Sequence, residues 1–416
     1  MIIKYLLVLL LYILPQIIFS QRVQVIEEKA RRMADHIVDQ TERNIVIVNS
    51  EKIVDSSFIL SHPDSCRLAS GYLEWYYPNG VLNIAMKRLA KALGEKEYNN
   101  YVSENYHFIM SNYRYFENSF KPGEPYESYF GENYSPYWQI FMMSELDHCG
   151  AMGAGLVDEY YDNENECYLE MINKIADYIS NKQVRLKDGT LVRYSPREYS
   201  LWTDDLFMSV PFLSRMGYLT GKEKYYNDAG KQFKQFRKYV FNEEKDIYHH
   251  FWFSDTVVEP FAYWGRANGW AIMALTEFIS YLPEEYPEHN YFIKFFRKHI
   301  SGIITYQDES GLWHQLLNKD DSYLETSCTS MFLYAIARGI RKGWIDDSYK
   351  KALDKGWEGL VKKINDKGVL SDICVGTPIG MDIEFYYERP KSDGDTHGTA
   401  AAIMAASEYI ILHNEY

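Results

Sequence analysis

Cysteine is scarce in this chain of 416 residues, which contains five, none of them close to another. An odd number of widely spaced cysteines argues against a disulfide framework and against a zinc cluster. Free buried thiols are therefore expected, with one incidental bridge left open. The signatures HExxH, GxSxG, the P-loop and the dinucleotide fingerprint are also missing, which disfavours metalloproteases, esterases and kinases. We expect no metal and no cofactor.

Basic residues are too few for a nucleic-acid partner. The chain has 44 Lys and Arg against 58 Asp and Glu, a formal net charge of -14. A broad basic surface for tracking a polyanion is therefore not expected. An acidic ligand would need a local basic clamp inside a pocket. Beyond residue 20 the sequence also lacks any apolar run long enough to cross a bilayer.

The one long apolar run is at the N-terminus, from Tyr5 to Phe19, with Lys4 before it. It ends at Ser20, and no cysteine lies there to carry a lipid. This pattern predicts a secretory signal peptide over residues 1–20 and a single domain over residues 21–416. The alternative is an uncleaved N-terminal anchor. We expect a periplasmic or secreted protein that has no membrane contact after cleavage, with its oligomeric state open.

Helical periodicity recurs along the rest of the chain, whereas strand patterns are scarce. Apolar helices alternate with charged, one-faced helices, which indicates buried inner helices and covering outer ones. There is no repeat of fixed period and no domain linker, so an all-α closed toroid is favoured over an open solenoid. The predicted helices are 23–41, 81–93, 98–113, 150–161, 167–180, 205–216, 222–240, 269–281, 289–306, 326–340, 348–364 and 399–412.

Polar and aromatic residues gather at the starts of the apolar helices. One such residue per helix start recurs at intervals of 57 to 72 residues, about one helical hairpin. If the inner helices run parallel around a ring, these residues meet at one end, which we call the mouth. The alternative is that helix starts attract polar residues simply for capping. The six residues are Tyr77, Asp147, Asp204, Arg266, Glu325 and His397.

Two adjacent acids, Asp204 and Asp205, stand at the start of the apolar helix predicted to run to Met216. Asp is a good N-cap and complements the helix dipole, so both could be structural. Neighbouring helical residues point about 100° apart, so one could cap while the other faces a pocket. Together Asp147 and Asp204 would supply the carboxylate pair that acid/base chemistry on a glycoside requires.

Other residues of the mouth suit an acidic sugar. Arg266 can bind a carboxylate through two parallel hydrogen bonds. Aromatic residues make up 16% of the chain, which fits carbohydrate binding but also fits a large core. His250 could bond the substrate or lie exposed, and Glu325 and His397 could simply cap or pack. The tryptophans that could line a sugar-binding pocket are Trp202, Trp264 and Trp270.

Four segments in this order resemble glycoside hydrolase family 105, the unsaturated rhamnogalacturonyl hydrolases, which is related to family 88. The segments are ELDHCGAMGAG at 145–155, LWTDDLFM at 201–208, YWGRANGW at 263–270 and YLETSCTSMF at 323–332. The likeness covers roughly residues 25–412. It implies an (α/α)6 barrel, in agreement with the toroid expected from periodicity.

The resemblance implies hydration of the 4,5 double bond that polysaccharide lyases leave on a terminal uronic acid. Asp204 matches the general acid/base that would protonate C4, after which water adds at C5 and the hemiketal opens. Asp147 matches a second essential carboxylate. An acid that protonates carbon needs a raised pKa, which burial or a nearby like charge can supply.

The resemblance also implies a uronate subsite. His250 matches the family histidine, and Tyr77 and Met208 are expected at the same pocket. At position 193 an arginine replaces a histidine common in relatives that act on pectin fragments. We expect Arg193 or Arg197 to meet an anionic or sulfated sugar, as in ulvan, or to be a surface arginine. The residues implied to line the subsite are Trp202, Trp264, Arg266 and Trp270.

The function expected from the sequence is an exo-acting hydrolase. It would release 4,5-unsaturated glucuronyl or galacturonyl residues from rhamnose-containing oligosaccharides of the ulvan or rhamnogalacturonan type. Two alternatives stay open. One is a conventional glycosidase that attacks saturated sugars with Asp147 and Asp204. The other is a secreted carbohydrate-binding protein without catalysis.

Overall fold

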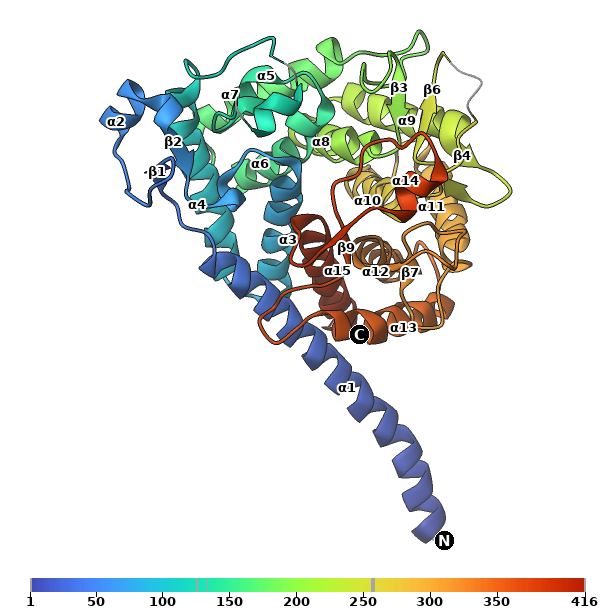
Figure 1. The fold of residues 1–416 in the computed structure, drawn as a ribbon. Coiled ribbons are helices and arrows are strands. Elements are labelled where there is room, and N and C mark those ends of the chain that lie inside the picture. Colours follow the sequence, from blue (N-terminus) through green and yellow to red (C-terminus); the bar gives the residue numbers. More distant parts are fainter. Residues whose placement is uncertain (1, 125, 132, 256–258, 415–416) are drawn as a thin grey trace.

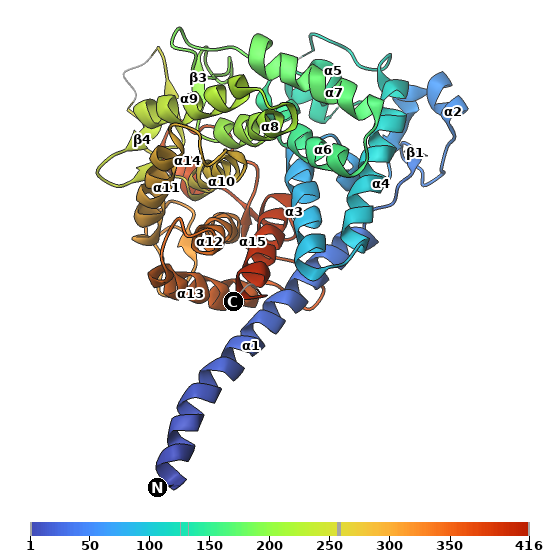
Figure 2. The ribbon, with the colours of Figure 1, turned by 180° about the vertical axis from the view of Figure 1, so that it is seen from behind.

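A computed structural model describes residues 2–124, 126–131, 133–255 and 259–414 (Figure 1). Within it, six helices form an inner ring in which each packs against the next and the last returns to the first (Figures 1 and 2). The predicted closed all-α toroid is thereby confirmed as an (α/α)6 barrel. The inner helices are α3 (Tyr77–Leu93), α6 (Gly150–Asp162), α8 (Asp205–Thr220), α10 (Gly265–Tyr281), α12 (Thr326–Arg341) and α15 (Thr396–Asn414).

An outer layer covers this ring, and each outer helix packs against one inner helix. The difference in sequence explains the difference in place. All residues of α8 from Asp205 to Gly217 are buried, whereas buried and exposed residues alternate along α9. A helix that is apolar all round must lie inside, and a one-faced helix covers it. The outer helices are α1 (Ile2–Asp39), α4 (Glu97–Asn112), α7 (Glu166–Asp177), α9 (Glu223–Val240), α11 (His289–Ile304) and α13 (Lys350–Leu360).

Inner helices α6 and α8 approach closely at the mouth because Gly150 has no side chain. A Cβ atom at Gly150 would lie 1.6 Å from the carbonyl oxygen of Met208, which no structure tolerates. Only glycine permits this contact of two backbones. The contact brings the segment that carries Asp147 against the start of α8.

Short antiparallel ladders join the helices at the mouth, and each has two strands of two or three residues. They are too short to show a period-two pattern in the sequence. Three short helices, α2 (Ser56–Ser61), α5 (Trp138–Met142) and α14 (Ile383–Tyr387), lie in the same connections. The pairs are β1 (Ile45–Ile47) with β2 (Cys66–Leu68), β3 (Ser200–Trp202) with β6 (Phe251–Phe253), β4 (Phe241–Asn242) with β5 (Ile247–Tyr248), β7 (Trp313–His314) with β8 (Leu324–Glu325), and β9 (Ile373–Cys374) with β10 (Lys391–Ser392).

Two inner helices begin four residues earlier than predicted. Helix α3 starts at Tyr77, with Pro78 in its first turn, where the fixed φ of proline suits a helix. Helix α10 starts at Gly265, so Arg266 and Trp270 lie within the helix rather than on the segment before it. The predicted ranges, 81–93 and 269–281, therefore leave out the first turn of each helix.

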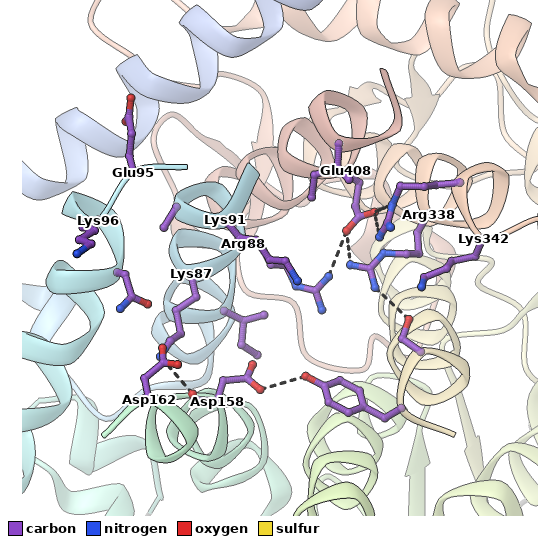
Figure 3. A pocket seen from close by; sticks show the side chains of 17 residues that line it. Lys87, Arg88, Lys91, Glu95, Lys96, Asp158, Asp162, Arg338, Lys342 and Glu408 are labelled. Atoms are coloured by element: carbon purple, nitrogen blue, oxygen red, sulfur yellow. Dashed lines mark hydrogen bonds and ion pairs between the residues drawn. The ribbon is translucent and has the colours of Figure 1, made fainter. Parts of the chain in front are cut away.

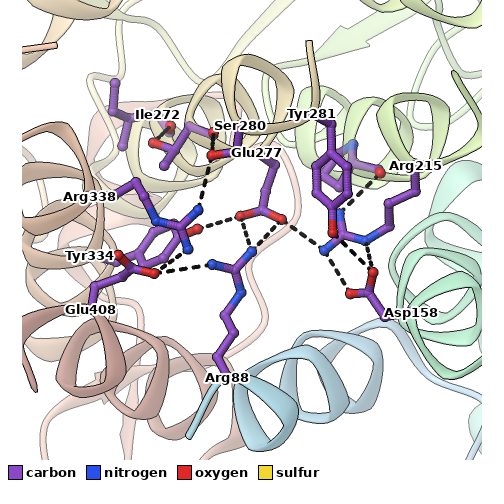
Figure 4. A network of polar contacts seen from close by, with 12 residues as sticks. Arg88, Asp158, Arg215, Ile272, Glu277, Ser280, Tyr281, Tyr334, Arg338 and Glu408 are labelled. Atoms are coloured by element: carbon purple, nitrogen blue, oxygen red, sulfur yellow. Dashed lines mark hydrogen bonds and ion pairs between the residues drawn. The ribbon is translucent and has the colours of Figure 1, made fainter. Parts of the chain in front are cut away.

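The end of the barrel opposite the mouth is closed by charges (Figure 4). Six charged side chains, one from each inner helix, alternate in sign around the ring, and α12 adds a second arginine, Arg341, that also binds Glu408. Three positive and three negative groups give a neutral set inside the fold. In ring order from α3 to α15 the residues are Arg88, Asp158, Arg215, Glu277, Arg338 and Glu408.

These six charges are bonded to one another, and we call them the closed-end ring. Glu277 lies 2.7 Å from Arg88 and 2.9 Å from Arg215. Arg215 also contacts Asp158 at 2.8 Å, and Glu408 accepts from Arg88 and Arg338. Buried charges are tolerated when they are paired in this way. The ring therefore fills the barrel axis at this end.

Outside the closed-end ring lies a cavity of about 700 Å³ that is open to solvent (Figure 3). Lys91, Lys96 and Lys342 stand around it. The inner helices α3 and α12 end here, and cations at helix C-termini complement the helix dipole. This accounts for Lys91 in the last turn of α3 and for Lys342 at the end of α12, whereas Lys96 stands at the start of α4.

The N-terminal region is one continuous helix, α1, whose first half projects away from the ring in both views (Figures 1 and 2). Its second half packs against α15 and completes the outer layer. Among the residues whose side chains the structure describes, which start at residue 21, no helix could cross a membrane. All five cysteines are free, and Cys167 is the exposed one.

Candidate active site

The ladder between β3 and β6 brings two sequence-predicted residues together at the mouth. Trp202 pairs with Phe251, and the Thr203 N–H donates to the carbonyl of His250 at 2.9 Å. The Thr203 hydroxyl donates to the carbonyl of His249 at 2.6 Å. These bonds fix the next residue, Asp204, opposite the imidazole of His250.

The Asp204 side chain does not cap its helix. Its Oδ2 lies 3.3 Å from Nε2 of the buried His250, and neither atom has a hydrogen-bond partner in the described part of the chain. The side chain is 14% exposed. Buried polar atoms in proteins nearly always form hydrogen bonds. Two buried polar atoms without partners at the wall of a cavity therefore indicate a ligand-binding site. Capping therefore does not account for Asp204.

The tautomer of His250 follows from its other nitrogen. Nδ1 lies 2.7 Å from the hydroxyl of Tyr386, and that hydroxyl accepts the N–H of Gly380 at 3.2 Å. If the tyrosine then donates its own proton to Nδ1, each of these donors has an acceptor. This arrangement places the imidazole proton on Nε2, the nitrogen that faces Asp204.

Arg193 lies beneath the mouth and is only 4% exposed. Its guanidinium binds Asp147 through both carboxylate oxygens, at 2.7 and 3.0 Å. It also binds Asp205 at 2.6 and 3.0 Å and reaches Glu145 at 3.4 Å. The guanidinium carbon stacks 4.6 Å above the ring of Trp202. One buried cation thus holds three carboxylates and a tryptophan.

The expectation that Arg193 meets an anionic sugar needs revision, because carboxylates of the protein occupy its guanidinium. It is not a surface arginine either. Arg197 is the more exposed of the two and lies 5.0 Å from the ring of Phe253. Arg193 neutralises Asp147 and Asp205 here, and the sequence could not show which carboxylates would be near.

Burial raises the pKa of Asp205 to about 7, and Asp147 and Asp204 nearby act in the same direction. Arg193 opposes this effect but does not cancel it. Burial also raises the pKa of Glu145. A proton shared within this acidic group at neutral pH would reduce the repulsion that an anionic substrate meets.

Tyr77 faces the same cavity from the first turn of α3. Its hydroxyl lies 2.5 Å from Nε2 of His397, and Nδ1 of that histidine lies 2.5 Å from Asp395. The ring of Trp270 meets Tyr77 edge-on at 6.3 Å between centroids. His397 is therefore bonded rather than merely packed.

Arg266 is placed differently from the sequence prediction. It is 1% exposed, and its guanidinium donates to the backbone carbonyls of Cys374 and Val375. It stacks 4.5 Å from the ring of Trp264. The guanidinium thus anchors the segment that follows β9 and does not line the cavity. A direct clamp on a substrate carboxylate is not what this geometry presents.

The cavity at the mouth has a volume of about 590 Å³. Six of the ten residues predicted for the site line it: Tyr77, Asp147, Arg193, Trp202, Asp204 and Met208. The other four lie behind this wall. His250 supports Asp204, Trp264 packs on His250 at 4.6 Å, Trp270 packs on Phe207 at 4.9 Å, and Arg266 holds the segment after β9.

Sequence reasoning missed several lining residues. Tyr76 is adjacent to the predicted Tyr77, and Ser195 lies between Arg193 and Arg197. Both could therefore have been predicted from their neighbours in the sequence. Gly376, Thr377 and Pro378 come from the connection between α13 and α15, where no pattern marks them. Tertiary bonds from Arg266 and Arg389 hold this segment over the cavity. The remaining missed residues are Phe130, Gln139 and Glu145.

Two curated proteins are similar to parts of this chain. Over 251 residues the chain is 28% identical to the unsaturated rhamnogalacturonyl hydrolase YesR of Bacillus subtilis, which covers 58% of this chain and 71% of that protein. It is 30% identical over 217 residues to an unsaturated 3S-rhamnoglycuronyl hydrolase of Alteromonas, covering 50% of this chain and 51% of the relative. The second match therefore spans about half of the relative's length.

Solved structures share the fold. A possible member of family GH105 from Salmonella enterica superposes with a TM-score of 0.70 and 23% identity over 95% of both chains. The model of Glycosyl Hydrolase Family 88 matches residues 50–413. That span includes all four segments on which the resemblance rested, and the resemblance is confirmed. The chain belongs to Glycosyl Hydrolase Family 88.

Proposed function

We propose that this protein is an exo-acting unsaturated uronyl hydrolase. It would bind an oligosaccharide whose non-reducing end carries a 4,5-unsaturated glucuronyl or galacturonyl residue and release that residue by hydration of the double bond. Relatives that share its family are unsaturated uronyl hydrolases by name. A rhamnose-containing lyase product of the ulvan or rhamnogalacturonan type is the proposed substrate.

The proposal rests on a difference in hydrogen bonding between the two predicted catalytic carboxylates, Asp147 and Asp204. Within the residues that the structure describes, one oxygen of Asp204 has no hydrogen-bond partner, whereas both oxygens of Asp147 are bonded to Arg193. A conventional glycosidase needs two carboxyl groups free to act, one as acid and one as base or nucleophile. Hydration of an enol ether needs one acid at C4. The geometry therefore favours hydration.

The steps follow from this placement. The carboxyl group of Asp204 donates a proton to C4, and the charge that develops at C5 is met by the acidic wall of the cavity. Water adds at C5, which yields a hemiketal that opens and releases the sugar. Nε2 of His250 faces the Asp204 carboxyl group at 3.3 Å, and Tyr386 holds the imidazole through its Nδ1.

The substrate carboxylate needs hydrogen-bond donors, and Arg266 is not free to supply them. We assign this role to Gly376 and Thr377, which line the cavity and whose backbone N–H groups have no partner in the described part of the chain. Arg266 fixes the segment from below, and Arg389 donates to the carbonyl of Gly376. The two arginines thus do not contact the substrate carboxylate. They position the backbone segment whose N–H groups bind it.

The test is direct. The purified protein is incubated with lyase digests of rhamnogalacturonan, of ulvan and of a glycosaminoglycan, and the ultraviolet absorbance of the conjugated double bond is followed. Loss of absorbance in one digest identifies both reaction and substrate. Release of sugars from saturated oligosaccharides would instead indicate a conventional glycosidase. Binding without turnover would indicate a carbohydrate-binding protein.

We also propose that residues 1–20 direct export and are then removed. The apolar run from Tyr5 to Phe19 supports this proposal. N-terminal sequencing of the protein recovered from its host tests it. A mature chain that starts near Gln21 is expected, and a chain that retains Met1 would contradict cleavage.

A further inference from the structure

The cavity at the closed end of the barrel has an excess of positive charge. It lies outside the closed-end ring, has a volume of about 700 Å³ and is open to solvent (Figure 3). Seven basic and four acidic side chains line it, in a chain whose formal net charge is -14. A local excess of one sign, opposite to that of the whole molecule, indicates a ligand that carries negative charge.

Three lysines at this cavity, Lys91, Lys96 and Lys342, form no ion pair among the residues that the structure describes. The four carboxylates at the cavity are all paired with other basic side chains, so none of them is left to neutralise these lysines. The positive charge of the three lysines is therefore available to a ligand. The pairs are Glu95 with Arg31 at 2.6 Å, Asp158 with Arg215 at 2.8 Å, Asp162 with Lys87 at 2.7 Å, and Glu408 with Arg341 at 3.0 Å.

Lys96 is the most informative of these lysines. It is the N-cap residue of α4, where the positive end of the helix dipole disfavours a cation. The same dipole effect favours Lys91 and Lys342, which stand at the C-terminal ends of α3 and α12. Figure 3 shows Lys96 and Lys342 on opposite sides of the cavity. The fold thus accounts for two of the lysines, whereas the position of Lys96 is explained by a ligand in the cavity.

A row of three tyrosines leads to the same cavity. They stand in the last turns of three neighbouring inner helices, and the ring centroid of Tyr218 lies 5.8 Å from that of Tyr161 and 5.8 Å from that of Tyr281. Tyr281 lines the cavity, whereas Tyr161 is 42% exposed and Tyr218 is 61% exposed. Adjacent exposed rings of this kind mark a binding surface, and their flat apolar faces suit the face of a sugar ring.

We propose that the closed end of the barrel is a second carbohydrate-binding site, which holds a segment of an acidic polysaccharide. The tyrosine row packs on the sugar rings, and the three lysines neutralise their carboxylate or sulfate groups. A neutral sugar would leave the lysines unpaired, and a small inorganic anion would make no contact with the exposed rings. The combination of both features therefore selects an acidic sugar.

This site and the mouth lie at opposite ends of the inner helices. Helix α8 has 16 residues, which corresponds to a length of about 24 Å. One sugar unit therefore cannot occupy both sites. The closed end keeps the protein on a polymer, and this raises the concentration of chain ends around the mouth. The inference goes beyond the proposed function and does not depend on the reaction at the mouth.

The experiment measures the mobility of the purified protein in native gels that contain an intact polysaccharide. Intact chains have few ends, so retardation reports on binding to the interior of a chain. The three polysaccharides are ulvan, which is sulfated, polygalacturonate, which carries carboxylates alone, and neutral dextran. We expect retardation by ulvan, by polygalacturonate or by both, and none by dextran. Retardation by ulvan alone would identify sulfate as the group that is bound.

Two outcomes of these gels would overturn the proposal. One is that neither acidic polysaccharide retards the protein. The other is that dextran retards it as strongly as the acidic polysaccharides do, because the lysines would then have no part in binding.

Tyr218→Ala removes the middle ring of the row and should weaken binding of the acidic polysaccharide about tenfold. Tyr194→Ala is the matched control. Tyr194 is 63% exposed, but it stands between Arg193 and Ser195, which line the cavity at the mouth. This variant should bind the polysaccharide as the wild type does. Loss of binding in Tyr194→Ala with full binding in Tyr218→Ala would place the polysaccharide at the mouth and contradict the proposal.

Lys96→Gln should weaken binding about threefold at low salt and less at high salt, because exposed charges are screened. The helix dipole disfavours Lys96, so the same variant should resist denaturant at least as well as the wild type. A loss of binding is then not a loss of fold. Lys245→Gln is the control, at an exposed lysine that does not line the cavity, and it should leave binding unchanged. Equal binding by Lys96→Gln and the wild type would contradict the role of the lysines.

The second site and the proposed function can fail separately. If the wild type binds an acidic polysaccharide but consumes no unsaturated substrate, the proposed function fails and the second site stands. If the wild type consumes an unsaturated substrate but is retarded by neither acidic polysaccharide, the proposed function stands and the second site is wrong.

Discussion

The two ends of the barrel use buried charge in opposite ways. At the closed end six charges alternate in sign around the ring and are bonded to one another (Figure 4). At the mouth Glu145, Asp147 and Asp205 contact a single arginine, Arg193, and an oxygen of the nearby Asp204 has no hydrogen-bond partner among the described residues. The first set comes from all six inner helices, whereas the second lies at and before the starts of α6 and α8. Buried charges that are all paired with opposite charges are structural, whereas an excess of buried carboxylates is typical of an active site.

The comparison predicts that changes at the mouth affect catalysis and changes at the closed end affect stability. The largest effect is expected from Asp204→Asn, which keeps the shape and removes the proton donor. We expect kcat to fall about 1,000-fold, as the loss of a general acid does. Steady-state kinetics on the unsaturated substrate measure this, with circular dichroism to show that the fold is intact.

Asp162→Asn is the matched control for this variant, because Asp162 is a half-exposed acid at the closed end. Its activity should equal that of the wild type. If Asp204→Asn retained more than a tenth of the wild-type kcat, Asp204 would not be the acid, and the unpaired state of its oxygen would need another explanation.

The second effect concerns stability. Glu277→Gln leaves Arg88 and Arg215 without the carboxylate that joins them. Removal of one partner from a buried ion network costs about 3 to 5 kcal/mol. Denaturant unfolding should show this loss while the folded variant keeps its kcat. Glu95→Gln, at a partly exposed pair with Arg31, should cost about 1 kcal/mol or less. Equal losses in the two variants would contradict a special role for the ring.

A third prediction concerns pH. The pKa of Asp205 is raised to about 7 in the folded protein by burial, against about 3.9 in the unfolded chain. The folded protein then binds more protons between these values. Its free energy of unfolding should therefore decrease as pH rises from about 4 to about 7, by up to a few kcal/mol. Asp205→Asn should flatten this slope in unfolding curves measured across the range, and an unchanged slope would show that Asp205 is ionised throughout.

The smallest effect is expected from Arg266→Lys. A lysine keeps the charge but cannot bond both carbonyls of the segment after β9 in the same way. We expect KM to rise about tenfold with little change in kcat, because the segment that binds the carboxylate is displaced. A fall in kcat with constant KM would instead place Arg266 in the chemical step.

The sequence contains more of this arrangement than periodicity alone revealed. The mouth residues Tyr77, Asp147, Asp204, Arg266 and His397 are each followed eleven residues later by a charge of the closed-end ring. Eleven residues are about three helical turns, so both residues lie on the same face, toward the barrel axis. The exception is Arg338, which follows Glu325 by 13 residues. A search at this spacing would have predicted both ends together.

The helices were predictable because their burial patterns are strong. Helix α8 was expected from Asp205 and begins there, and α12 was expected over 326–340 and runs one residue further. The roles of Arg193 and Arg266 were not predictable. An arginine in the sequence does not show whether a carboxylate, a carbonyl or a ligand will be in reach, because that choice depends on residues far away in the chain, such as Asp147 and Cys374.

The central claim is that Asp204 protonates an unsaturated uronic acid at this mouth. It is tested most directly by following the ultraviolet absorbance of lyase digests with the wild type and with Asp204→Asn in parallel. We expect the wild type to remove the absorbance of at least one digest, whereas the variant, though folded, does not. Equal loss with both proteins, or release of saturated sugars with the double bond intact, would contradict it.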